Sequence, residues 1–179
     1  MTVPLSTLGE VSLGAEDAAQ AIAAVKAQLR IEGSGEDEWI ADLCETALSL
    51  AERFTGSVLI ARTLTAVLPA TSGWQALPEM PVRAITAVEG LPAEGAAFAM
   101  PTSAYGIDID AAGQGWVRVT APGAAGRVRV TYAAGIAEDW SALPSTLAMG
   151  AVLLGAHLFE GRDRDAPPAA ITALWRPWR

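Results

Sequence analysis

One histidine and one glutamate have the spacing of a catalytic or metal-binding pair. His157 and Glu160 are three residues apart, so on a helix both side chains lie on one face. An imidazole beside a carboxylate can transfer protons or bind a metal ion. The sequence has one histidine and one cysteine, however, and no second cluster of ligand residues completes such a site. A histidine near a helix end usually hydrogen-bonds there, so we expect a structural role, with metal or acid–base chemistry as the alternative.

Two aspartates form a second candidate for chemistry. Asp108 and Asp110 alternate in a predicted strand and are therefore expected on the same side, where paired carboxylates can bind Mg²⁺ or hydrolyse glycosides. The A-A-G-Q-G sequence that follows favours an exposed turn instead. The glycine-rich run 123–127 lacks the Gly-Lys-Ser/Thr of a phosphate-binding loop, and Cys44 is expected to be a small core residue. The sequence therefore predicts no catalytic residue, no cofactor and no metal site.

The C-terminus has the composition of a binding surface. Two of the six tryptophans lie within its last five residues, interleaved with arginines. Tryptophan and arginine are the residues that most often anchor protein interfaces. The residues expected to contact a partner are Leu174, Trp175, Arg176, Trp178 and Arg179. Pro177 disfavours a continuous helix and predicts an extended end that can dock, although the segment can instead fold back on its own domain.

Composition indicates a soluble, intracellular protein. Half of the residues (51%) are hydrophobic, no basic and apolar leader begins the sequence, and the uncharged stretch 143–159 is too short to span a membrane. The net charge is −8, and residues 1–56 hold ten acidic residues against three basic ones. This balance argues against direct binding to nucleic acid, because such binding depends on basic residues that neutralise phosphates. The simplest interpretation of the acidic segment is a solvated helix surface.

Periodicity predicts two helices before residue 57. The first has one apolar stripe, formed by Ala18, Ile22, Val25 and Leu29. Ser34 and Asp37 resemble a capping pair that opens the second helix, and Gly56 is expected to end it with a left-handed conformation. The expected buried face of the second helix comprises Ile40, Leu43, Ala47, Leu50 and Phe54. The residues expected off that face are Asp42, Glu45, Glu52 and Arg53.

The middle of the sequence predicts an antiparallel β section. Strands are expected at 60–68, 83–89, 105–110, 116–120 and 127–132, separated by loops at 69–81, 90–104 and 111–115. The turn at 122–123 predicts that the last two strands form a hairpin.

A late apolar helix and a short tail complete the chain. Pro144 fits the first turn of a helix over 145–159, which carries no charge except on His157. Such a helix is buried on several sides, either in its own core or between subunits. The fold class is therefore α+β: a small helical bundle with an inserted antiparallel β section. The single domain 1–179 comprises N-terminal helices (1–56), the β section (57–135), the late helix (141–161) and the tail (166–179).

Four segments resemble one protein family. They are V-K-A-Q-L-R-I (25–31), E-R-F-T-G-S-V-L-I-A-R-T (52–63), A-H-L-F-E-G-R-D (156–163) and L-W-R-P-W-R (174–179). In order and spacing they resemble the head–tail connector (adaptor) proteins of tailed bacteriophages and gene transfer agents. The structural residues of these motifs are Leu29, Arg30, Ile31, Thr55, Gly56, His157 and Glu160. Ser57, Arg62 and the pair Leu158-Phe159 depart from the family pattern.

The resemblance implies a non-catalytic part of a virion or phage-like particle. It implies a homo-oligomeric ring, expected to be dodecameric, in the neck beneath the portal protein, which the C-terminal tail would contact. A stopper or tail-completion protein would bind on the other side. Double-stranded DNA would pass through the channel without sequence-specific binding, along an acidic wall that repels phosphates. Assembly in the bacterial cytoplasm, with no membrane partner, is also implied.

Two other functions remain as alternatives. One is a small metal-dependent hydrolase that uses Asp108, Asp110, His157 and Glu160. The other is a regulatory binding module that recruits a partner through its tail.

Overall fold

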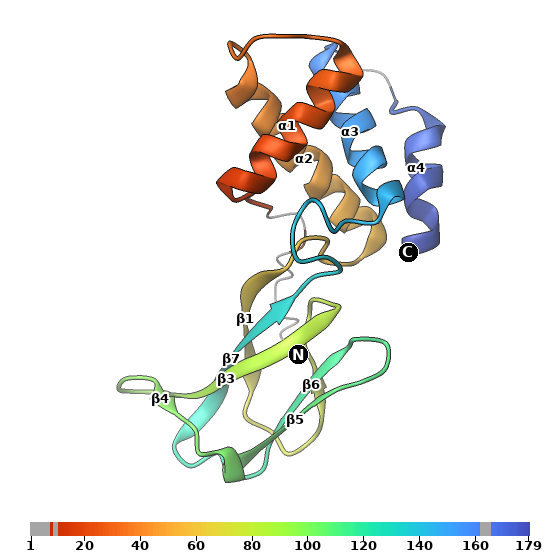
Figure 1. Ribbon diagram of the computed structural model, residues 1–179. Helices are drawn as coiled ribbons and strands as arrows, with labels where there is room; N and C mark the ends of the chain where they lie inside the picture. The colour runs from red at the N-terminus through yellow and green to blue at the C-terminus, as the bar shows by residue number, and fades with distance from the viewer. Residues whose placement is uncertain (1–7, 9–10, 162–165) are drawn as a thin grey trace. The chain divides into compact units, whose positions relative to one another are not determined.

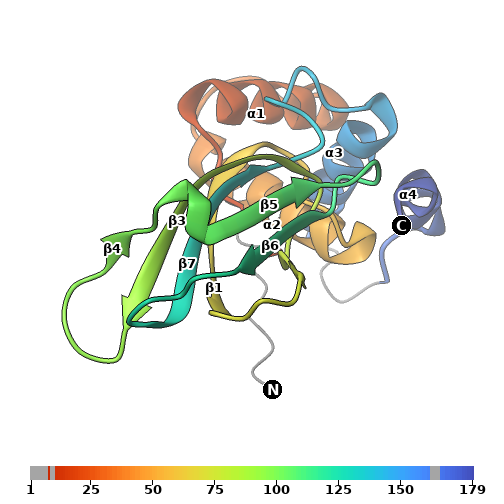
Figure 2. The ribbon, with the colours of Figure 1, turned by 90° about the horizontal axis from the view of Figure 1, so that it is seen from below.

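The computed structural model describes residues 8, 11–161 and 166–179. The chain forms two compact units, whose elements are shown in Figures 1 and 2. Among the described residues, the helical unit lies within Thr7–Ile60 and Ile136–Arg179, and the β unit comprises Ala61–Gly135. Helices and antiparallel sheets confirm the predicted α+β class. Among the described residues, no helix combines the length and hydropathy needed to cross a membrane.

Four helices pack around one core in the helical unit. They are α1 (Ala15–Leu29), α2 (Asp37–Thr55), α3 (Ser145–Phe159) and α4 (Ala169–Trp175), followed by the 3₁₀ turn η2 (Arg176–Trp178). α1 and α2 pack against each other and against α3, and α4 packs against α3 (Figure 1). Small side chains such as Ala21, Cys44 and Ala47 fill much of this core, which lets the helices approach closely.

The buried face of α2 differs from the predicted one. Leu50 is 45% exposed, whereas Glu52 is fully buried. The residues that α2 does bury are Ile40, Cys44, Ala47, Leu48, Ala51, Glu52 and Thr55. Glu52 is buried because the chain leaving α2 folds back over it, and its Oε1 accepts a hydrogen bond of 3.0 Å from the N–H of Leu59. A buried carboxylate with such a donor is satisfied, so the helix face can extend across it.

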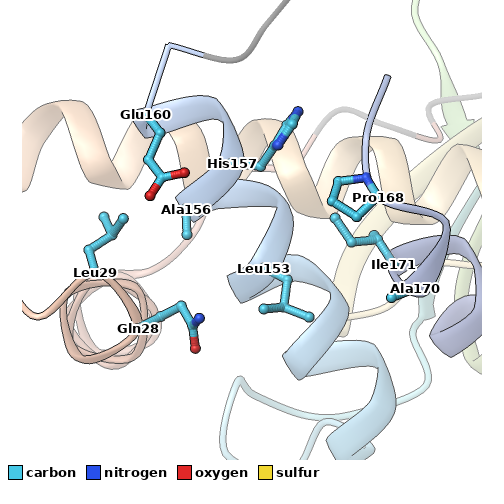
Figure 3. Close-up of a pocket in the computed structure, with 9 residues that line it drawn as sticks. All are labelled: Gln28, Leu29, Leu153, Ala156, His157, Glu160, Pro168, Ala170 and Ile171. Atoms are coloured by element: carbon cyan, nitrogen blue, oxygen red, sulfur yellow. The ribbon is translucent and has the colours of Figure 1, made fainter. Parts of the chain in front are cut away.

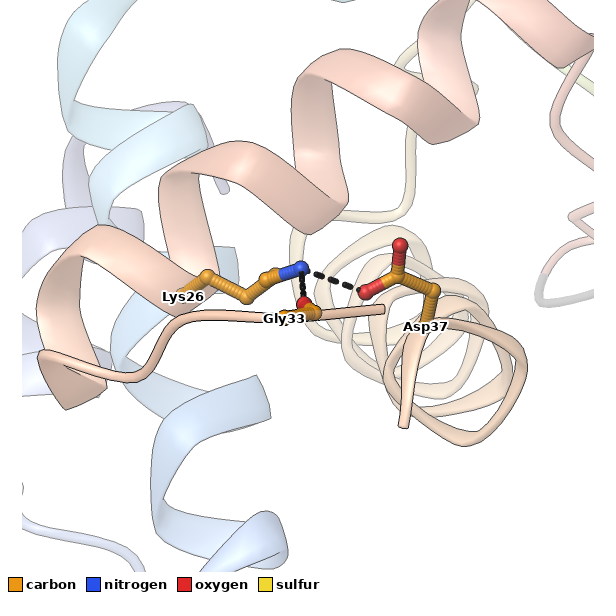
Figure 4. A network of polar contacts seen from close by, with 3 residues as sticks. All are labelled: Lys26, Gly33 and Asp37. Carbon is orange, nitrogen blue, oxygen red and sulfur yellow. Dashed lines mark hydrogen bonds and ion pairs between the residues drawn. The ribbon is translucent and has the colours of Figure 1, made fainter. Parts of the chain in front are cut away.

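The turn between α1 and α2 is held by a lysine rather than by a cap. α2 begins at Asp37 with no side-chain cap, so the predicted Ser34–Asp37 capping pair is wrong. The Asp37 carboxylate instead accepts a 2.6 Å hydrogen bond from Lys26 Nζ, which also donates to the carbonyl of Gly33 (Figure 4). At the other end of α2, Gly56 has φ +72° and donates its N–H to the backbone carbonyl of Glu52, which confirms the predicted left-handed cap.

α3 is apolar because it contacts three other helices. Pro144 directly precedes the helix at the N-cap position rather than in its first turn. Contacts with α1, α2 and α4 surround α3, so a core within the chain accounts for most of its uncharged surface. Met149 stays 49% exposed.

The chain leaves and re-enters the helical unit at adjacent points. Residues 58–60 lie beside 136–137, where Ile136 and Ala137 donate N–H bonds of 2.9 Å to the carbonyls of Val58 and Leu59. Ile60 and Ala137 form a parallel bridge. The two ends of the intervening segment are therefore joined inside the helical unit.

Two antiparallel sheets form the β unit. One has the strand order β1-β7-β3-β4 and the other β2-β6-β5. The strands are β1 (Arg62–Pro69), β2 (Gln75–Ala76), β3 (Val82–Pro92), β4 (Phe98–Ala99), β5 (Tyr105–Ile109), β6 (Gly115–Val119) and β7 (Ala125–Ala134), with a 3₁₀ turn η1 (Thr102–Ala104) before β5. The five predicted strands are present, and two predicted loops contain the short strands β2 and β4.

The predicted hairpin between β6 and β7 is wrong. β6 pairs with β5 and β2, whereas β7 pairs with β1 on one edge and β3 on the other. Both edges of β7 are thus occupied, and the turn at Pro122-Gly123 carries the chain from one sheet to the other. Tyr132 of β7 is buried and donates its O–H to the equally buried Glu79. Burial, reinforced by this carboxylate, raises the pKa of Tyr132.

Candidate partner interface

The C-terminal segment folds against its own helical unit. Trp175 is 3% exposed, and its Nε1 donates to the carbonyl of Leu147 at 3.3 Å. The indole lies over Gly150 of α3, where an added Cβ would overlap Nε1 and lie 2.8 Å from Cε2. The absence of a side chain at Gly150 is therefore what lets α4 lie this close to α3.

Further contacts hold the end of the chain in place. The Phe54 ring of α2 lies 6.0 Å from the Trp175 ring between centroids, and the Arg179 guanidinium lies 5.9 Å from the Phe54 centroid. Trp178 Nε1 donates to Thr146 Oγ1 at 3.1 Å. The prediction of an extended end is wrong, because Pro177 lies in a 3₁₀ turn and burial of Trp175 stabilises the folded-back form.

Part of this segment remains accessible. Arg176 and Arg179 are exposed, and Leu174 and Trp178 are half-buried. Within the described chain neither arginine has an acidic partner. Two guanidinium groups beside an indole edge suit a partner that offers carboxylates and apolar side chains. Trp175 differs from the other four predicted contact residues because it positions this surface from within the core.

The motif residues near the helix ends have structural positions. Arg30 ends α1 in a left-handed conformation (φ 58°), and the N–H of Ile31 bonds to the carbonyl of Lys26 at 3.2 Å. Thr55 Oγ1 donates to the carbonyl of Ala51 at 2.9 Å, next to the Gly56 cap. Leu29 is half-buried beside the core. Sequence reasoning missed Lys26 and Glu52, although both lie inside the matched segments.

His157 and Glu160 border one hollow but do not converge. They line a space of about 290 Å³ together with Leu29 of α1 and Pro168 before α4. In Figure 3 the Glu160 carboxylate lies on the side of Leu29, whereas the His157 ring points away from Glu160. Within the part of the chain that the structure describes, no three His, Cys, Asp or Glu residues are grouped as a metal site would require. Arg162 and Asp163, at the end of that motif, lie outside the described residues.

Asp110 closes a turn, as expected. Its Oδ1 accepts the N–H groups of Ala112 and Gln114, and its Oδ2 accepts Trp116 Nε1–H at 3.1 Å. The bond from Trp116 and the backbone bonds lower the pKa of Asp110. Asp108 accepts the N–H of Ile109. These two aspartates belong to the β unit, whereas His157 and Glu160 belong to the helical unit.

Cys44 is a core residue, as expected. It is 2% exposed. Burial, with a smaller effect of the Glu45 charge, raises the pKa of its thiol to about 12. A thiol with this pKa is not a nucleophile at neutral pH.

Similarity to known proteins is found at the level of structure. No protein-family model matches the sequence, and no curated protein matches it. Solved structures do match, and three of them come from gene transfer agent (GTA) particles. A chain in the neck of an empty GTA particle, determined with C6 symmetry, has a TM-score of 0.74 and 26% identity, and the match covers 99% of this chain and 94% of that one.

The other two structures give the same result. A chain in the neck of a native GTA particle, determined with C12 symmetry, matches with a TM-score of 0.69 and 26% identity over 100% of this chain and 94% of that one. A chain in the virion of a native GTA particle matches with a TM-score of 0.69 and 26% identity over 99% and 95%. The predicted resemblance to connector proteins is therefore confirmed along the whole chain. The similarity favours a structural role in a particle neck over an enzymatic one.

Proposed function

We propose that this chain, as a neck protein of a phage-like particle, is a non-catalytic head–tail adaptor. Copies of the chain form a ring between the portal protein and a stopper or tail-completion protein. The observation that carries this proposal is the match over nearly the full length of neck chains, with no large segment of either chain left over. The C6 and C12 symmetry of those necks supports a ring of twelve subunits.

The C-terminal segment is the proposed portal contact. Trp175 fixes α4 on α3, and Trp178 and Arg179 have contacts of their own, so the end of the chain that carries Arg176 is held in place before any partner binds. A surface that is ordered in advance loses less conformational entropy on binding. Leu174 adds apolar area beside them.

The charge distribution supports passage of DNA without binding. The helical unit holds fifteen acidic and seven basic residues, whereas the β unit holds five of each, so the helical unit carries the whole net charge of −8. An acidic ring repels phosphates and releases no counterions from DNA, which keeps the channel free of tight contacts. The ring is assembled in the bacterial cytoplasm and becomes part of the particle neck.

Mass measurement with the portal tests this function. Light scattering of the purified protein mixed with portal from the same genome is expected to give a discrete complex larger than either component. The double variant Arg176→Glu/Arg179→Glu is expected to bind the portal with an affinity lower by about tenfold or by a larger factor, because it reverses two exposed charges at the proposed contact. Arg127→Glu, an exposed charge reversal in the β unit, is the matched control and is expected to bind normally.

Two results would contradict the proposal in different ways. A wild-type protein that never binds the portal would refute the adaptor function. A double variant that binds as tightly as the wild type would leave the adaptor function in place and refute the assignment of the C-terminal contact.

A further inference from the structure

An arginine and a tryptophan form an exposed stacked pair on the β unit. The Arg118 guanidinium of β6 lies 4.6 Å from the Trp74 ring centroid, within the range of a cation–π interaction. Both side chains lie over Gly106 of β5, where an added Cβ would be 3.0 Å from Arg118 Nε and 3.4 Å from Trp74 Cη2. The pair therefore depends on a bare backbone beneath it. Trp74 remains 45% exposed despite its contact with Arg118.

The pair has no acidic partner in its own chain as described. Cation–π contact with Trp74 is the interaction that the structure records for Arg118, which makes no ion pair with any described residue. An oriented guanidinium on an exposed aromatic ring is the type of group that is enriched in protein interfaces, and a carboxylate is its complementary partner.

A hollow on the helical unit offers the complementary groups. It has a volume of about 420 Å³ and lies along α2, beside the N-terminal segment at Val11. Leu50, 45% exposed, and Val11 give it an apolar part, while Asp42 and Glu45 give it two carboxylates. The remaining lining residues are Thr46, Ser49 and Arg53. Glu45 already accepts the N–H of Leu13, whereas Asp42 is exposed and has no partner among the described residues.

We propose that Trp74 and Arg118 of one copy bind in the α2 hollow of the neighbouring copy, with Arg118 paired to Asp42 and Trp74 packed on Leu50. This inference rests on the proposed ring. The contact joins two different surfaces, which is the arrangement that lets identical subunits close into a ring. Charge complementarity favours a second copy as the occupant, because the net negative charge of this protein lies entirely on its helical unit.

Disulfide crosslinking tests the contact without the portal. In a Cys44→Ala background, which removes the buried thiol, Arg118→Cys and Asp42→Cys are made separately and together at two exposed positions. Mixing the two single variants at high concentration under mild oxidation is expected to give a crosslinked dimer, and neither variant alone should give one. The variant with both cysteines should give a ladder of higher oligomers. A mixture that crosslinks no better than Thr120→Cys mixed with Asp42→Cys, or a double variant that crosslinks only within one chain, would overturn the proposal.

Charge exchange tests the same contact on the portal. Arg118→Glu and Asp42→Arg are each expected to reduce the number of copies bound per portal at a given concentration. The protein concentration needed to fill the ring should rise about tenfold. Combining the two changes in every copy should restore filling, because each neighbouring pair regains opposite charges. Single variants that fill the ring normally, or a double variant that fails to recover, would overturn the inference while the wild-type ring still supports the adaptor function. Normal ring filling by Arg118→Glu, together with the loss of a DNA affinity that the wild type proves to have, would likewise overturn it, in favour of a nucleic-acid contact.

Discussion

Replacing Gly150 by alanine tests whether the C-terminal helix is docked on α3 in the free protein. In an ordinary helix this change is stabilising by about 0.5–1 kcal/mol, because glycine loses more backbone entropy on folding. Here the new Cβ would overlap the Trp175 indole, and the Trp175 side chain is held by its bond to Leu147 and by Phe54. Forcing a methyl group into a filled core costs about 1–3 kcal/mol. We therefore expect Gly150→Ala to be destabilising by about 1–2 kcal/mol.

Thermal and chemical unfolding followed by helix circular dichroism measures this effect. For a chain of this length the expected loss is roughly 3–6 °C in Tm. Gly155→Ala in the same helix is the matched control, since its Cβ would meet one Val25 methyl at 3.3 Å rather than overlap a ring, and we expect little change or a small gain. In a Trp175→Leu background, Gly150→Ala should become neutral or stabilising, because the overlapping indole is gone. If Gly150→Ala stabilises the wild-type protein, Trp175 does not lie on α3 in solution and the account of the C-terminal surface is wrong.

Three further predictions concern buried and turn-forming groups. Cys44 should react with a thiol reagent about a thousandfold more slowly in the folded than in the unfolded protein at pH 8, because its pKa is raised from 9.0 to about 12. The thiol of the unfolded protein ionises at lower pH, so Cys44 contributes stability below pH 9 that is lost as the pH rises toward 12. Equal reaction rates in the two states would contradict the burial of Cys44. Glu52→Ala should be destabilising by about 1–3 kcal/mol in urea unfolding, because the buried N–H of Leu59 loses its acceptor. Glu52→Gln keeps an acceptor oxygen and should lose less stability. Equal losses in the two variants would argue against the Glu52–Leu59 hydrogen bond. In an NMR pH titration, Asp110 should titrate below its ordinary pKa of 3.8. Its contribution to stability is therefore present at neutral pH and is lost as the pH falls through that lowered pKa. Asp110→Asn should lack this loss of stability in acid, and a variant whose stability falls in acid just as in the wild type would contradict the prediction.

Periodicity in the sequence was sufficient to find the elements but not their partners. The apolar repeat around Val25 and the alternation in 116–120 and 127–132 identify one helix and two strands, because each pattern reports the environment of single residues. Alternation does not encode which strand lies alongside, so β6 and β7 look like a hairpin although they belong to different sheets. The pairing depends on β1, more than fifty residues earlier, which occupies the edge of β7 that a hairpin would need.

Two polar or aromatic residues were misjudged for a related reason. Glu52 looks solvent-exposed by residue type, and only the position of Leu59 after the turn makes its burial favourable. Trp175 looks like an exposed anchor because its binding site, the bare backbone at Gly150, lies on a different helix. In the candidate interface, the sequence identified the arginines that stay accessible but not the residue that positions them. The Trp74–Arg118 pair had no sequence signal, since it depends on the register that places Gly106 opposite Arg118.

The adjacent segments at residues 58–60 and 136–137 make the β unit replaceable as a whole. Because the parallel bridge between Ile60 and Ala137 joins the two ends within the helical unit, a short glycine-serine linker can replace residues 61–135 with a small loop-closure cost. Insertions with neighbouring ends are the type that recombination can exchange without disturbing the host fold. The same two positions therefore offer a place to graft a new domain onto the helical unit.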